Sequence, residues 1–268
     1  MGSFEEAKIN SIVIIESLFD DDQKTGTELY NDRVKGYIEY HRRDEMHHEL
    51  QNISSKTEFI ELLKELTDKI DEYPPGLLIH VEAHGSSDKS GIVFSDSSLA
   101  TWKEIQDSFI SLNVKLNNQL YISLATCFGR NFYKTIDYNK KSPFRAFISA
   151  SAEVYPDEII EDYGQIFEEL IDSGDLIKAY ISADQKGTRF FYKDARVVTT
   201  ESYFSLEEKL KDPEFKESFL AKTQKNWDKI KLTENLPPFE SLDFEQILEL
   251  VKIDLMNKIT KNFFFDNV

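Results

Sequence analysis

Two apolar segments, Leu77–Gly85 (LLIHVEAHG) and Leu120–Gly129 (LYISLATCFG), decide the fold. Each is aliphatic and stops abruptly at polar or small residues, which is typical of a buried parallel strand that ends at the carboxyl edge of a sheet. The first segment ends at His84, and the second ends at Cys127, the single cysteine of the chain. Because the carboxyl ends of neighbouring strands face one crevice in an open α/β sheet, we expect these two side chains to meet. A thiol beside an imidazole is a nucleophile beside its base.

The sequence around these segments alternates between strand and helix patterns. Ser11–Ser17 predicts a first buried strand, Lys35–His41 a second strand nearer an edge, and Phe144–Ala150 a later strand. Capping boxes at Ser55 and Thr101, each followed by an apolar stripe with i, i+3, i+4 spacing, predict two helices. This order favours an α/β fold with a mostly parallel central sheet and helices on both faces.

Three helices and two strand-like pieces are expected beyond the second segment. A short helix from Phe128 to about Asp137 would place Cys127 near its amino end, where a thiolate is favoured. Asp157 and Asp175 are expected to be N-caps of two more helices. Residues 188–200 contain two strand-like pieces, TRFFYK and RVVTT.

The last part of the chain has a different pattern. Asp212-Pro213 predicts a helix start, and apolar residues from about Leu242 onward share one face of a further helix. We therefore expect residues 1–200 to form the α/β domain and residues 201–268 to form a helical extension packed on it. Three roles remain open for these apolar helices: completing the core, blocking the site, or docking a partner.

Composition excludes several functional classes. The net charge of −17 argues against nucleic-acid binding, which needs clustered lysine and arginine, and against anionic membrane surfaces. No apolar run is long enough to span a bilayer, and the first residues lack the features of a signal peptide. One cysteine cannot form an intramolecular disulfide. These features predict a cytoplasmic protein with no nucleic-acid or membrane partner.

The two segments resemble the caspase-like (clan CD) cysteine peptidases, and most closely the CHAT group of bacterial proteases. In that family an apolar block ends in His-Gly, and a second block ends in a small residue and Cys, as at His84-Gly85 and Thr126-Cys127. Gly91–Asp96 with Leu99–Ile105 is similar to the strand and helix that follow the family's His-Gly. Phe147–Ser151 with Tyr163–Leu170 is similar to its last core strand and helix. The likeness covers roughly residues 8–200 and implies a three-layer caspase-like sandwich.

The resemblance implies a cysteine endopeptidase that cleaves a protein or peptide substrate without a cofactor. Cys127 would be the nucleophile, and His84 would activate it and serve the leaving group. The backbone N–H groups of Gly85 and Cys127 would hold the oxyanion. The resemblance also implies control by a regulatory partner, a ligand or oligomerisation, and a place in bacterial stress or phage defence. The non-enzymatic alternative is a caspase-like scaffold that binds a protein partner.

Substrate preference is not carried over from the family. Caspases and metacaspases have a polar or acidic residue two positions before the cysteine, where this chain has Ala125. Asp20 and Asp22 follow the first strand, and Asp96 and Glu153 lie near other loops at the sheet edge. These acids favour a basic residue before the cleaved bond. The alternative is a solvated acidic surface.

Two further expectations concern metal binding and processing. His80, Glu82 and His84 alternate along one strand and could share a zinc ion. However, alternation directs His80 and Glu82 into a helix layer, and His47-His48 reads as a polar loop, so we expect no metal site. The segment between Cys127 and the Phe144 strand is too short for the linker that caspases cleave to mature. We therefore expect a single-chain enzyme.

Overall fold

The structure, a computed structural model, describes residues 6–41, 45–227, 230 and 236–265. The strands of its central sheet follow the spatial order β2 (His47–Asn52), β1 (Ser11–Ser17), β3 (Leu77–Gly85), β6 (Leu120–Ala125), β7 (Ala146–Ala150) and β8 (Phe190–Asp194). Neighbours from β2 to β7 are parallel, and β8 is antiparallel to β7. The prediction of a mostly parallel central sheet is confirmed.

A small antiparallel ribbon extends the sheet at the carboxyl end of β3. Its strands are β4 (Gly91–Val93) and β5 (Leu99–Thr101). β4 pairs with the last two residues of β3, so that His84 faces Val93 and Gly85 faces Ile92 in the register. This pairing fixes the backbone of the His-Gly segment where β3 leaves the parallel sheet.

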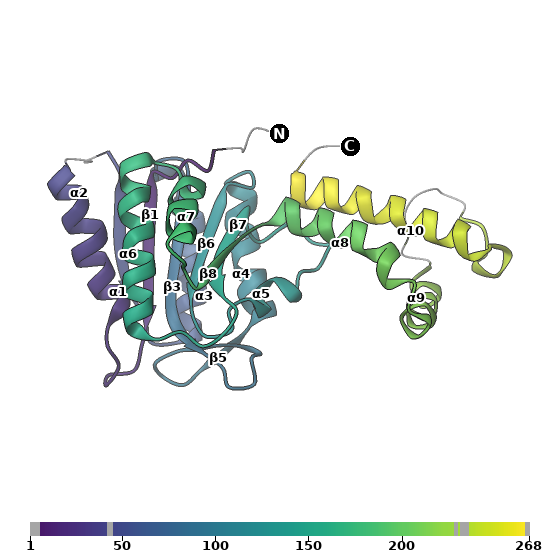
Figure 1. Cartoon of the computed structure of the whole chain (residues 1–268), viewed down its shortest axis with the longest axis horizontal. Coiled ribbons are helices and arrows are strands. Elements are labelled where there is room, and N and C mark those ends of the chain that lie inside the picture. Colours follow the sequence, from purple (N-terminus) through teal and green to yellow (C-terminus); the bar gives the residue numbers. More distant parts are fainter. Residues whose placement is uncertain (1–5, 42–44, 228–229, 231–235, 266–268) are drawn as a thin grey trace. The chain divides into compact units, whose positions relative to one another are not determined.

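Helices cover both faces of the sheet (Figure 1). One face carries α1 (Thr25–Glu28), η1 (Leu29–Lys35), α2 (Gly36–His41), α6 (Pro156–Ser173) and α7 (Leu176–Gln185). The other face carries α3 (Lys56–Lys69), η2 (Ile70–Glu72), α4 (Trp102–Lys115) and the short α5 (Asn131–Lys134). Strand side chains alternate between the two faces, so each strand supplies both helix layers.

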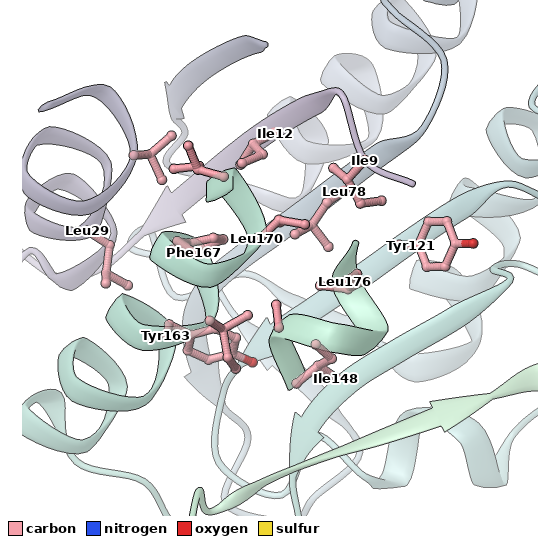
Figure 2. Packing of buried hydrophobic residues seen from close by; sticks show 14 of the residues in the cluster. Ile9, Ile12, Leu29, Leu78, Tyr121, Ile148, Tyr163, Phe167, Leu170 and Leu176 are labelled. Carbon is pink, nitrogen blue, oxygen red and sulfur yellow. The ribbon is translucent and has the colours of Figure 1, made fainter. Parts of the chain in front are cut away.

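The core beneath α6 and α7 shows this alternation directly. Figure 2 shows Ile12, Leu78 and Ile148, from three strands, in one cluster with Tyr163 and Leu170 of α6. All five side chains are at most 1% exposed. Fully burying side chains of this size stabilises a fold by about 1.5–3 kcal/mol each.

The sequence motifs at the helix starts are largely present. Thr101 and Glu104 form a reciprocal capping box on α4, and Ser55 accepts the backbone N–H of Glu58 at the start of α3. Asp175 caps α7 as predicted. In contrast, Asp157 is not an N-cap; it lies in the first turn of α6, which begins at Pro156. Proline is favoured at that first position because its missing N–H needs no partner there.

One strand prediction and one loop prediction near the amino terminus were wrong. Residue 35 ends η1 and residues 36–41 form α2, and the buried side chains there are Val34 in η1 and Ile38 in α2. The edge strand is instead β2, which contains the His47-His48 pair that we expected in a loop. β2 pairs only with β1, at the edge of the sheet. An edge strand can be polar, so its sequence did not indicate a strand.

Two later predictions also needed correction. Within the helix predicted for residues 128–137, only Asn131–Lys134 are α-helical. Residues 127–130 form turns, so the cysteine does not begin a helix. The first strand-like piece in residues 188–200 is β8, but the second begins α8 (Ala195–Lys209). Val198 and Thr199 are buried there on a helix, although β-branched residues favour strands.

The chain divides into two compact units. The first contains residues 1–136 and 142–194, which include every strand of the sheet, and the second contains residues 137–141 and 195–268. The second unit is helical in its described part, with α8, α9 (Pro213–Lys225), η4 (Phe239–Ser241), α10 (Phe244–Ile259) and η5 (Thr260–Phe264). Asp212 caps α9, and Phe263 is fully buried within this unit. The unit begins slightly earlier than the predicted boundary after residue 200.

Candidate active site

The register of β3 and β6 brings His84 and Cys127 toward one another. His80 pairs with Ser123, and Glu82 pairs with Ala125, on these parallel neighbours. Because side chains two residues apart share a face of a strand, His84 and Cys127 extend the same row beyond the paired residues. Both residues line one pocket of about 100 Å³ at this edge of the sheet.

The backbone at Gly85 lies against the backbone of Cys127. A Cβ atom placed on Gly85 would lie 2.2 Å from the Cys127 carbonyl oxygen and 3.1 Å from the Cys127 Cβ atom. No side chain fits such a gap, so the glycine is required for the close approach of the two segments. This contact provides a physical reason for the glycine after the histidine.

The imidazole of His84 is held by two groups from the loop after β1. Its Nε2 atom lies 2.7 Å from Asp22 Oδ2, and the ring of Phe19 stacks on it with 5.2 Å between the centroids. The His84 side chain is 43% exposed, so its position depends on these contacts more than on burial. With Nε2–H donating to Asp22, Nδ1 is the ring nitrogen left for proton transfer.

The loop that carries Asp22 is itself fixed by hydrogen bonds. Asp22 Oδ2 accepts the backbone N–H of Phe19 at 2.8 Å, and Lys24 Nζ donates to the carbonyls of Leu18 and Phe19. Partial burial raises the pKa of Asp22. The hydrogen bonds from His84 and Phe19 and the nearby charges of His84 and Lys24 lower it, and together they outweigh the effect of burial. The net effect holds the pKa of Asp22 below its usual value, so its carboxylate is ionised at neutral pH.

Cys127 lies in a tight turn directly after β6. The next residue, Phe128, has a left-handed φ of 57°, which costs a non-glycine residue roughly 1–2 kcal/mol. The Phe128 backbone N–H donates to Ala152 O at 3.0 Å, and Lys89 Nζ lies 4.1 Å from the centroid of its ring. These contacts hold the turn in its strained form. The cysteine thiol, half-buried, has the Val154 carbonyl as a weak acceptor at 3.9 Å.

Only two of the five predicted substrate-binding residues line the pocket. Asp22 and Ala125 line it, whereas Asp20, Asp96 and Glu153 are exposed and are not among its lining residues. Asp96 is engaged in the β4–β5 turn, where its carboxylate accepts the Ser98 N–H at 2.7 Å. The described residues that line the pocket are Leu18, Asp22, Gln23, Thr25, Glu82, Ala83, His84, Ala125, Thr126, Cys127, Val154, Pro156 and Ile159.

A buried polar chain lies below His84 on the same face of the sheet. Ser123 Oγ is 2.8 Å from His80 Nδ1, and His80 Nε2 is 2.9 Å from Glu82 Oε1. Thr25 Oγ1 donates to Glu82 Oε2 at 2.6 Å. His80 is fully buried beneath Tyr163 of α6, so it cannot contact a substrate. The expectation that His80 faces a helix layer is confirmed.

Sequence reasoning missed Asp22 as the partner of His84 and missed two polar neighbours of Glu82, Thr25 and Glu16. Asp22 was assigned to a substrate pocket because it belongs to an acidic run, and the pattern contains no sign that it turns back onto His84. Thr25 and Glu16 were not singled out at all, since single polar residues near a buried strand carry no distinctive spacing. Glu16, which closes the apolar run of β1, is the one signal that could have drawn attention.

Among the described residues, no group of three or more histidine, cysteine, aspartate or glutamate side chains could hold a metal ion. The helices in the described ranges are also too short or too polar for any of them to cross a membrane.

Comparisons with known proteins show a likeness in structure but none in sequence. No family model matches the sequence, and no curated protein matches it. Among solved structures, the chain is similar to the Drosophila initiator caspase Dronc, with a TM-score of 0.45 and 14% sequence identity. The match covers 70% of this chain and 81% of that chain. Residue roles in this protein therefore have to be argued from its own geometry.

Proposed function

We propose that this protein is a caspase-like cysteine endopeptidase that hydrolyses peptide bonds through Cys127 and His84. One arrangement carries the proposal: a thiol and an imidazole, distant in the sequence, line the same small pocket at the carboxyl edge of a parallel sheet. The chain's single cysteine occupies a strained turn there, and the imidazole is oriented by a carboxylate. Nucleophile, base and orienting acid are the parts that covalent hydrolysis requires.

The acylation step uses these groups in order. The Cys127 thiolate attacks the carbonyl carbon of the peptide bond, and backbone N–H groups at Gly85 and Cys127 receive the developing oxyanion. The C–N bond then breaks, and the His84 imidazolium gives its proton to the leaving amine. The products are a free amine and a thioester on Cys127.

Deacylation restores the enzyme. His84, now neutral, takes a proton from water as the water oxygen attacks the thioester carbonyl. The C–S bond breaks, the acid product leaves, and the thiolate–imidazolium pair is formed again. Asp22 does not touch the reacting atoms in this scheme; it orients the ring and stabilises the imidazolium.

The finer assignment rests on sequence motifs alone. Within caspase-like peptidases, the His84-Gly85 and Thr126-Cys127 blocks resemble the CHAT group. On that resemblance, a partner, a ligand or oligomerisation controls the enzyme in the cytoplasm, and stress or phage defence is its setting. The proposed catalytic pair can be tested before its regulation and its cellular setting are known.

Cleavage of a complex peptide mixture tests the proposed activity. Purified protein would be incubated with a denatured proteome digest, and new amino termini would be mapped by mass spectrometry. We expect cleavage by the wild type and a loss of about 10²-fold or more in Cys127→Ala and His84→Ala. His41→Ala, on an exposed position of α2, is the matched control. Cleavage that persists in Cys127→Ala would overturn the proposal.

A further inference from the structure

The loop between β1 and α1 carries Phe19 and Asp22, the two groups that hold the His84 ring. Its residues, 18–24, are half-buried or exposed, so burial in the core does not fix its path. Holding one residue in a single backbone conformation costs roughly 1–2 kcal/mol of conformational entropy. The orientation of His84 therefore depends on polar contacts within and around this loop.

Two buried carboxylates fix the point where the loop enters α1. Glu82 on β3 accepts the hydroxyl of Thr25 at 2.6 Å. Glu16 on β1 accepts the backbone N–H and the hydroxyl of Thr27 at 2.9 and 2.8 Å. Glu82 is 1% exposed and Glu16 is 4% exposed, so both are held firmly by the sheet. The end of the loop is thus tied to the core, and the path before it needs a contact of its own.

A single cation provides that contact. Lys24 Nζ donates to the carbonyl of Leu18 at 2.9 Å and also to the carbonyl of Phe19. The ammonium thereby joins the last residue of the loop to its first two residues. Hydrogen bonds from a charged donor are about twice as strong as neutral ones. A neutral apolar side chain at position 24 would leave both carbonyls without this donor.

Phe19, Asp22 and Lys24 form one hydrogen-bonded unit. The Phe19 N–H donates to Asp22 Oδ2 at 2.8 Å, and the Asp22 N–H donates to the Phe19 carbonyl at 3.0 Å. The same carbonyl accepts the Lys24 ammonium. A shift of the Phe19 backbone would therefore move both the ring that stacks on His84 and the carboxylate that binds Nε2.

We propose that Lys24 is a positioning residue for His84: it closes the loop in the form in which Phe19 and Asp22 together orient the imidazole. The proposal deepens the peptidase function proposed above and rests on it. Lys24 is not among the residues that line the pocket, so it acts through its two loop partners. The buried Glu82 and Glu16 serve the same purpose from below, since they anchor the start of α1.

The His84 ring can be observed in the resting protein, without turnover. Long-range ¹H–¹⁵N spectra show which ring nitrogen of each histidine carries a proton, and His84→Ala assigns the signal. We expect a resolved Nε2–H signal from His84 in the wild type, because this proton is held against Asp22. In Lys24→Met the signal should be lost through exchange with water.

Two further variants control this measurement. Lys24→Arg keeps the charge and the donors, so it should restore at least part of the His84 signal. Lys64→Met removes an exposed lysine on α3 and should have no effect. A His84 signal in Lys24→Met that matches the wild type would overturn the proposal.

Kinetics separates positioning from a general loss of structure. We expect Lys24→Met to lower kcat about tenfold and to leave KM within about twofold, because the ring is misplaced while the pocket lining is unchanged. Lys24→Gln guards against a Lys24→Met protein that does not fold, and it should lower kcat several-fold. Wild-type kcat in either folded variant would overturn the proposal.

A double-mutant cycle tests whether Lys24 acts through Asp22. If it does, Lys24→Met should reduce kcat less in an Asp22→Asn protein than in the wild type. Losses that multiply independently would contradict this route.

The two kinds of measurement separate this inference from the peptidase function. A His84 signal that requires Lys24, in a protein that cleaves no peptide, would support the positioning contact and contradict the peptidase. Cleavage that requires Cys127 and His84 but not Lys24 would leave the peptidase intact and contradict the positioning role.

Discussion

At the scale of single residues, the bond between Asp22 and His84 has a consequence for the pH dependence of activity. The Asp22 carboxylate, whose pKa is lowered, lies 2.7 Å from His84 Nε2. Other titratable groups near the ring are Lys24, which adjoins Asp22, and Cys127 and Glu82, which line the pocket. In Asp22→Asn the His84 ring loses the carboxylate that orients it.

We expect Asp22→Asn to reduce kcat by about 10- to 100-fold, the effect of losing a hydrogen bond to a charged group. Because the charge of Asp22 is lost as the pH falls through its lowered pKa, the ratio of wild-type kcat to Asp22→Asn kcat should shrink on that acidic side. Asp22→Glu, which restores the charge, should recover part of the lost kcat. A ratio that does not change with pH would show that Asp22 has a structural role only.

The approach of Gly85 to Cys127 supports a prediction about a single methyl group. Gly85→Ala would drive a Cβ atom into the Cys127 carbonyl, so one of the two backbone segments must move. We expect a loss of stability of about 1–3 kcal/mol and a loss of Cys127 reactivity toward peptide electrophiles. Urea denaturation and labelling kinetics would measure the two effects.

Gly164→Ala is the matched control. In α6 the added methyl meets only the flexible side chain of Arg33, at 3.2 Å or more. Alanine also favours a helix over glycine by about 1 kcal/mol. A Gly85→Ala protein as stable and reactive as Gly164→Ala would contradict the close contact described here.

At the scale of elements, the polar chain from Ser123 through His80 to Glu82 joins β3 and β6 inside the core. His80→Leu would leave Glu82 and Ser123, both at most 1% exposed, without their shared partner. We expect a destabilisation of about 3–5 kcal/mol, the range for breaking a buried pair. Chemical denaturation would show it, and the exposed His41→Leu change should remain within about 0.5 kcal/mol. A small effect in His80→Leu would mean that the hydrogen bonds from Ser123 through His80 to Glu82 are not needed for stability.

The start of α4 allows a prediction about pH and stability. Hydrogen bonds from Thr101 and Lys56 lower the pKa of Glu104 from 4.5 to about 2. A lowered pKa in the folded state means that the stabilisation is complete above pH 4.5 and is lost as the pH falls toward about 2. The stability difference between wild type and Glu104→Gln should therefore shrink over that interval. A difference that stays constant with pH would show that the charge of Glu104 does not contribute.

Elements also show why some structure could be predicted from the sequence and some could not. β1, β3 and β6 are central strands buried on both faces, so their sequences are mostly apolar and distinctive. The edge strand β2 has no such run, and residues 35–41 alternate over too short a length to separate strand from helix. Likewise, the meeting of His84 with Cys127 follows from strand order. The turn of Asp22 onto His84 depends on a loop path that no periodicity encodes.

At the scale of the whole molecule, the segment after Cys127 decides whether the chain is expected to be cut during maturation. It is held through hydrogen bonds from Phe128 and Arg130 to the carbonyls of Ala152 and Ala150, and from Asn113 to Ser142 O. A cut within residues 128–143 would break the chain in a segment that is hydrogen-bonded on both sides and that adjoins Cys127. We expect the active protein to remain one chain of 31.2 kDa, as intact mass spectrometry would show. Activity that appears only with a discrete cut in this segment would contradict the single-chain prediction.

The division into two units bears on where the chemistry is located. Cys127, His84 and Asp22 all belong to the first unit, which contains the complete sheet. The helices of the second unit contribute no lining residue to the described pocket. Variants in the second unit therefore leave the three residues of the proposed site unchanged.

The most direct test is covalent labelling of the purified full chain with a peptidyl acyloxymethyl ketone that ends in arginine. Intact mass and peptide mapping would locate the adduct in the wild type, Cys127→Ala and His84→Ala. We expect one adduct on Cys127 in the wild type, none in Cys127→Ala, and labelling at least tenfold slower in His84→Ala. A wild-type adduct that forms equally fast without His84, or that forms on another residue, would contradict the proposed catalytic pair.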